Sequence, residues 1–111
     1  MVRIGAIHME YKVIVDCFEK NPHDVCTVPL NRKEPLWFYV FVKNNELWVE
    51  RAKSHRKSSS LTRGRVLKES ECETMIDIYQ RRKDGEAVSK EAIVITRNQV
   101  YWYGIFSDLG L

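Results

Sequence analysis

LWFYVFVK-NN-ELWVERAK, residues 36–53, predicts an antiparallel β-hairpin. Two β-rich runs, 36–43 and 46–53, flank Asn44-Asn45, and asparagine tolerates the positive φ angles that a two-residue hairpin turn requires. This turn fixes the register of the two strands, because it places the last residue of one run opposite the first residue of the next. Lys43 is therefore expected opposite Glu46.

The predicted hairpin has an aliphatic face and an aromatic face, because successive side chains of a strand point to opposite sides. The aliphatic face is expected to line the core, and it holds Leu36, Phe38, Val40, Val42, Leu47 and Val49. The aromatic face holds Trp37, Tyr39, Phe41 and Trp48. Large exposed apolar patches are uncommon on monomers, so the aromatic face needs a cover, a ligand or a partner protein.

The segment after the hairpin predicts a helix over 70–83. Ser70 and Glu73 have the spacing of a capping box, and Gly85 is placed to end the helix. A stripe of apolar residues at helical spacing follows the cap: Cys72, Met75, Ile76 and Tyr79.

The two ends of the chain are harder to interpret. The β-rich run from Tyr11 to Phe18 predicts a strand, and residues 21–24 predict a turn. Residues 89–95 and 97–109 predict helices, although Gly104 would cost a helix about 1 kcal/mol and a second hairpin is the alternative. The expected fold is a single α+β domain over 1–111, with a central antiparallel hairpin packed on the 70–83 helix and an N-terminal strand.

Composition narrows the class of protein. The chain has 111 residues, of which 44% are hydrophobic and 30% are charged, values typical of a globular domain and not of a disordered or collagen-like chain. Its longest apolar run, 36–42, is far shorter than the roughly 20 residues of a membrane span. The start of the chain has no signal-peptide pattern, so a cytoplasmic protein without a membrane partner is expected.

The cysteines and histidines predict neither disulfides nor a metal site. Three cysteines at irregular spacing favour free thiols. A zinc site drawn from Cys17, His23 and Cys26, with His8 or His55 as a fourth ligand, lacks the paired short spacing of structural zinc sites. No metal and no other cofactor are expected.

Positive charge is concentrated in residues 51–68, RAKSHRKSSSLTRGRVLK, which hold seven Lys or Arg and no acid. Such a block is usually solvated and often meets a polyanion, and its serines and glycine predict a loop over 54–65. The expected phosphate contacts are Arg51, Lys53, Arg56, Lys57, Arg63 and Arg65. The expected stacking platforms for bases are Trp37, Tyr39 and Trp48.

Non-catalytic binding of nucleic acid or another polyanion is therefore the main prediction, and three alternatives stay open. In the first, the aromatic face is a homodimer interface and the basic stretch is incidental. In the second, His55 serves as the base of a small metal-independent ribonuclease. In the third, the C-terminal helices form a helix-turn-helix whose recognition helix begins at residues 97–99. A further interpretation assigns no binding function to either feature. In it, the basic stretch is a solvated loop and the 70–83 helix covers the aromatic side chains.

Overall fold

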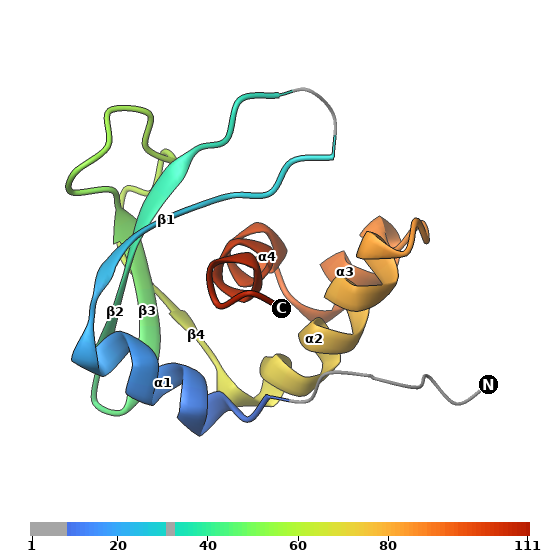
Figure 1. Cartoon of the computed structure of the whole chain (residues 1–111), viewed down its shortest axis with the longest axis horizontal. Coiled ribbons are helices and arrows are strands. Elements are labelled where there is room, and N and C mark those ends of the chain that lie inside the picture. Colours follow the sequence, from blue (N-terminus) through green and yellow to red (C-terminus); the bar gives the residue numbers. More distant parts are fainter. Residues whose placement is uncertain (1–8, 31–32) are drawn as a thin grey trace.

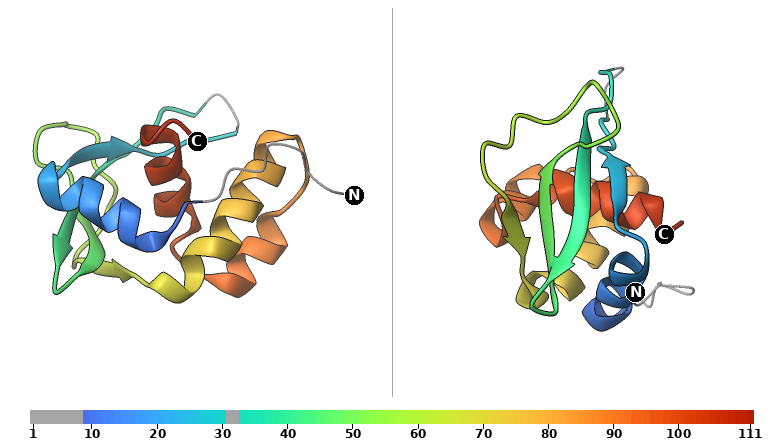
Figure 2. Two further views of the ribbon diagram at one scale, coloured as in Figure 1. Left: turned by 60° about the horizontal axis from the view of Figure 1, so that its bottom comes forward. Right: turned by 90° about the vertical axis from the view of Figure 1, so that its left-hand side faces the viewer.

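The computed structural model, which describes residues 9–30 and 33–111, is an α+β fold. Its antiparallel sheet has the strand order β1-β2-β3-β4, with all neighbours antiparallel. Helix α1 comes before the sheet in sequence, and three helices follow it. The elements are α1 (Tyr11–Lys20), β1 (His23–Cys26), β2 (Trp37–Lys43), β3 (Glu46–Arg51), β4 (Arg65–Leu67), α2 (Glu69–Lys83), α3 (Ser89–Ile95) and α4 (Gln99–Asp108). The helices lie on one side of the sheet, as Figures 1 and 2 show.

The hairpin prediction is confirmed in its turn and its register. Asn44 and Asn45 have φ angles of 53° and 61°, the conformation of a type I′ turn, and Lys43 lies opposite Glu46. The aliphatic face lines the core, where Phe38, Val40, Leu47 and Val49 are fully buried. Leu36 departs from this face, because it precedes β2 and is 43% exposed.

The predicted strand over Tyr11–Phe18 is wrong, because this segment forms helix α1. Its buried residues are Tyr11, Ile14, Val15 and Phe18, which follow the i, i+3, i+4, i+7 spacing of one helix face. The β-branched residues of the run favour a strand in isolation, but burial of this face on the sheet outweighs that preference. The Tyr11 hydroxyl joins two strands, because it donates to Leu67 O at 2.6 Å and accepts from Leu47 N at 2.8 Å.

Two short strands were not predicted. β1 begins at His23, inside the predicted turn, and places Val25 in the core at 2% exposure. β4 lies within the basic stretch and pairs with β3. Both are edge strands of three or four residues, so their pairing depends on the hairpin beside them and not on a local pattern.

The predicted helix at 70–83 is confirmed as α2, whose predicted apolar stripe is buried. Its predicted capping box is wrong, because the helix begins at Glu69 and Ser70 lies inside the first turn. The N-cap residue is Lys68, whose side chain makes no capping hydrogen bond. The helices pack on one side of the sheet, so the expected packing of helix on sheet is confirmed in this coarser form. α1 and α4 make the main contacts with the strands, and α2 packs against α1, α3 and α4 (Figure 1).

The C-terminal segment is helical, as predicted, and the second hairpin is excluded. α4 packs against β1 at close range, and Gly104 makes this approach possible. A Cβ atom at Gly104 would lie 2.6 Å from Cys26 O and 2.9 Å from Phe38 Cζ, closer than atoms tolerate. Residues 101–106 of α4 are all buried, so this helix cannot lie in a DNA groove as a helix-turn-helix would require.

The buried residues of all four helices and of strands β1 to β4 form one hydrophobic cluster. In the part of the chain that the structure describes, no helix is both long enough and apolar enough to cross a membrane.

Candidate polyanion-binding site

The outer face of the sheet, which we define as the face turned away from the helices, carries a row of aromatic rings. Tyr39 and Phe41 have ring centroids 5.8 Å apart, and Phe41 and Trp48 are 6.5 Å apart, each pair with planes inclined by 25°. All three rings are half-buried, and no helix of the described chain lies over them (Figure 2). The aromatic face expected from the sequence therefore exists, and helix α2 does not cover it.

Two lysines lie over this row. Lys53 Nζ is 4.3 Å from the centre of the Tyr39 ring, and Lys43 Nζ is 5.5 Å from that of Trp48. Both positions are within the range of cation–π attraction. Lys53 also pairs with Glu50 at 3.4 Å. One of the predicted phosphate contacts, Lys53, therefore lies on the same surface as Tyr39 and Trp48, while Lys43 was not among the residues predicted.

The connection between β3 and β4, residues 52–64, is the basic loop, and Asp24 pins it to the sheet. The Asp24 side chain is only 2% exposed and accepts three hydrogen bonds. Lys53 N donates at 2.9 Å, Ser54 N at 2.7 Å and His55 Nδ1 at 2.8 Å. Burial alone would raise the pKa of Asp24, but these bonds, led by the one from His55, hold the pKa below its ordinary value.

His55 is held from a second direction by Trp37. The two rings stack with centroids 3.4 Å apart and planes only 6° from parallel. The backbone of Trp37 also binds the loop. Trp37 N donates to Lys57 O at 2.7 Å, and Ser59 N donates to Trp37 O at 2.8 Å. Residues 53–59 of the basic loop are therefore fixed by side-chain and backbone contacts to β1 and β2.

A hollow of about 370 Å³ opens beside this stack. Lys57 and Glu34 both line it and form an ion pair with each other, while Arg56 has no ionic partner in the described part of the chain. The complete lining is Cys26, Glu34, Pro35, Trp37, His55, Arg56 and Lys57. The hollow thus combines two cations, a carboxylate and an imidazole on a rigid wall.

Two of the predicted phosphate contacts lie elsewhere. Arg51 is the last residue of β3 and is paired with Phe38 of β2. Its Nε donates to Leu61 O at 3.0 Å. Arg65 donates to Asn98 Oδ1 at 3.2 Å and lies 6.0 Å from the Tyr101 ring, at the start of α4. Arg63 is exposed in the basic loop. Lys53, Arg56, Lys57 and Arg63 are therefore the cations that the structure gathers in the basic loop.

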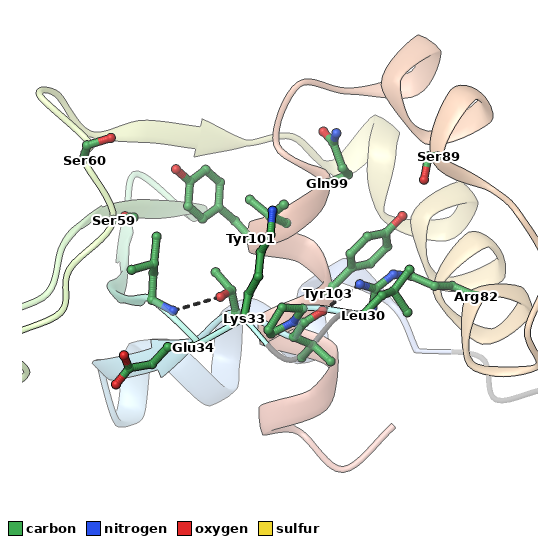
Figure 3. A pocket seen from close by; sticks show the side chains of 15 residues that line it. Leu30, Lys33, Glu34, Ser59, Ser60, Arg82, Ser89, Gln99, Tyr101 and Tyr103 are labelled. Atoms are coloured by element: carbon green, nitrogen blue, oxygen red, sulfur yellow. Dashed lines mark hydrogen bonds between the residues drawn. The ribbon is translucent and has the colours of Figure 1, made fainter.

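A second hollow of about 430 Å³ lies between residues 27–30 and 33–36 on one side and helices α2 and α4 on the other (Figure 3). Arg82 crosses one side, donating to Val28 O at 2.6 Å and lying 4.5 Å from the Tyr103 ring centre. Leu36 N donates to Thr27 Oγ1 at 3.0 Å, the bond drawn in Figure 3. Its walls are mostly apolar, so this hollow does not suit a polyanion.

Sequence reasoning missed Asp24 and Glu34, because neither lies in the basic stretch that they contact. The zinc ligands considered from the sequence do not come together: across residues 9–30 and 33–111, no three His, Cys, Asp or Glu side chains are close enough to share a metal ion. His8, one proposed ligand, lies outside the described residues. The three cysteines are free thiols.

Comparison with models of protein families, with curated proteins and with solved structures finds no match for this chain. The function of the site is therefore inferred from its own geometry.

Proposed function

We propose that this chain binds nucleic acid, or another polyanion, through the basic loop and the outer face of the sheet. The observation that carries the proposal is the pinning of the loop by Asp24, which sets cations beside a row of rings. Cations bind phosphates through counterion release, and aromatic rings stack on unpaired bases. The free thiols suit a cytoplasmic protein, and the cytoplasm supplies such ligands.

The contacts divide between the two parts of the surface. Arg56, Lys57 and Arg63 hold phosphates, because they are exposed on the loop. Tyr39 and Trp48 stack on bases after the flexible side chains of Lys53 and Lys43 move aside. Trp37 contributes indirectly, because the His55 ring is already stacked on it and takes the place of a base. Because a duplex keeps its bases stacked inside, single strands are preferred.

A salt titration tests this proposal. Fluorescence anisotropy with labelled random single strands and duplexes should show binding that weakens with salt, by about 0.7 in log K per decade of salt for each single-strand phosphate neutralised. The double variant Arg56→Glu/Arg63→Glu should weaken binding to all sequences and flatten this slope. Its stability should hardly change, because both side chains are exposed and have no ionic partner in the described part of the chain.

Lys12→Glu/Lys90→Glu is the matched control, because it makes the same change in net charge on exposed positions of α1 and α3. It should leave the slope unchanged. No binding by the wild type at low salt would refute the proposal, and equal losses in both double variants would show that only net charge matters. A dimeric mass in size exclusion, abolished by Trp48→Glu without loss of folding, would support the homodimer interface instead.

A further inference from the structure

The hollow beside Trp37 holds a carboxylate, an imidazole and two cations at one place. Charge stabilisation together with a proton acceptor and a proton donor is what metal-independent cleavage of a phosphodiester requires. We propose that this hollow cleaves RNA by attack of the ribose 2′-hydroxyl on the adjacent phosphorus. The inference rests on the proposed function, because the RNA strand must first bind the basic loop.

His55 is positioned as a proton carrier and not as a loose surface side chain. The Asp24 carboxylate can only accept, so the 2.8 Å bond places a proton on His55 Nδ1 and leaves Nε2 as the exchanging atom. The parallel Trp37 ring fixes the plane of the imidazole. A solvated loop histidine needs neither contact, and the side chain of His55 remains 39% exposed, so a substrate can reach it.

Glu34 and the cations complete the set. Glu34 carries its negative charge in the ion pair with Lys57, and its side chain is 63% exposed. It can therefore accept a proton from a bound ribose. Arg56 and Lys57 line the same hollow and stabilise the extra negative charge that develops on the phosphate oxygens during attack.

The reaction balances within the RNA and these side chains. Glu34 takes the proton of the 2′-hydroxyl, and the 2′-oxygen forms a bond to phosphorus. The bond from phosphorus to the 5′-oxygen breaks, and His55, which enters this step with both ring nitrogens protonated, gives its Nε2 proton to that oxygen. The products are a 2′,3′-cyclic phosphate and a 5′-hydroxyl, and no oxidant, reductant or other reactant is consumed. DNA binds the loop but is not cleaved, because it lacks the attacking hydroxyl.

The test compares wild type, Glu34→Gln and His55→Gln, purified in parallel, on a fluorescent oligoribonucleotide in the presence of EDTA. Wild type should cleave, and each variant should lose at least about 100-fold in rate, the contribution typical of a general acid or base. A single 2′-deoxy substitution should abolish cleavage at that nucleotide. Mass spectrometry of the 5′ fragment should show a terminal 2′,3′-cyclic phosphate.

Binding to the all-deoxy strand keeps the outcomes distinct. Glu34→Gln should bind it as the wild type does, because it replaces an exposed side chain by one of the same size. His55 also helps to fix the basic loop, so the folding of His55→Gln is checked separately, by circular dichroism and urea denaturation. Binding without cleavage by the wild type overturns this inference and leaves the proposed function standing. Cleavage by the variants at the wild-type rate also overturns it. Absence of binding overturns both.

Discussion

Gly104 decides how closely α4 approaches the sheet. Substitution Gly104→Ala adds a Cβ that meets the Cys26 carbonyl and the Phe38 ring, both in well-packed surroundings. Backbone and a fully buried ring cannot move aside cheaply, so we expect a loss of about 1–3 kcal/mol in the free energy of unfolding, measured by urea denaturation.

Gly64→Ala is the control for this substitution, because the nearest atom to its new Cβ is 3.5 Å away on the Trp48 ring. That distance is an ordinary contact, and loss of chain entropy in the unfolded state favours alanine. The control should therefore be neutral or slightly stabilising. Equal losses at both positions would show that the cost comes from replacing glycine in general and not from the contact of α4 with β1.

The residues also show where sequence reasoning stops. From the sequence, Gly104 counts against a helix, because its intrinsic cost is local while its benefit is a contact with Cys26 and Phe38, far away in the chain. The basic stretch was recognised by composition alone. Asp24, which pins that stretch, is an unremarkable carboxylate until β1 pairs with β2, and no sequence pattern could have linked it to His55.

At the scale of elements, agreement between independent local signals separates right predictions from wrong ones. The register of the hairpin was predicted to the residue because turn type, alternation and β-propensity all favour the same pairing, although the strands are shorter than predicted. Helices α2, α3 and α4 were predicted from apolar stripes and flanking residues. α1 was missed because its Val and Ile content favoured a strand while its apolar spacing favoured a helix.

The basic loop is an element whose order depends on one carboxylate. Asp24→Asn replaces an acceptor oxygen of a buried side chain by an amide donor, so at least one of the three donors loses its partner. We expect a loss of about 1–3 kcal/mol at pH 7. Tryptic cleavage at Arg56 and Lys57, followed by mass spectrometry, should become faster than in the wild type as the loop loosens.

The effect of Asp24 should depend on pH, with a definite sign. Its pKa is lower in the folded protein than in the unfolded chain, so its stabilising effect is complete above the unfolded value of about 3.9. The effect disappears as the pH falls through the folded value. Wild type and Asp24→Asn should therefore converge in urea stability at low pH. Asp16→Asn, at an exposed position of α1, is the control and should match the wild type throughout.

For the whole molecule, α4 is the central element that joins the layers. It lies between the sheet and the pair α2–α3, with Trp102, Ile105 and Phe106 fully buried (Figure 1). The outer face of the sheet is thereby left to the basic loop alone. A loop can present cations and rings in a way that a packed helix could not, because a helix there would bury the rings completely. The one-sided arrangement of helices is therefore what leaves a surface for a ligand.

Cys72 of α2 is only 2% exposed, and its burial changes the pKa of its thiol. Burial, with the nearby carboxylates Glu69 and Glu73 as weaker causes, raises the pKa of the Cys72 thiol from 9.0 to about 12. Burial likewise raises the pKa values of Tyr11 and Tyr103 above 10.0. In each case the neutral form is favoured by folding.

Stability should consequently fall at alkaline pH, and Cys72 should account for a measurable part of the fall. A group whose folded pKa is raised contributes its full stabilisation below the unfolded pKa, and this contribution is lost as pH rises toward the folded value. For Cys72 that window begins near pH 9. Each unit of pH inside it removes about 1.4 kcal/mol, so by pH 10.5 the loss from this thiol should be about 1–2 kcal/mol.

Urea denaturation of wild type, Cys72→Ala and Cys17→Ala at pH 8 and pH 10.5 measures this loss. Cys72→Ala should fall less steeply than the wild type, whatever its stability at pH 8, and retain only the part due to Tyr11 and Tyr103. Cys17 is exposed on α1, so its variant should follow the wild-type slope. Three parallel slopes would mean that the Cys72 thiol ionises as readily in the folded protein as in the unfolded chain, and that water reaches this side of α2.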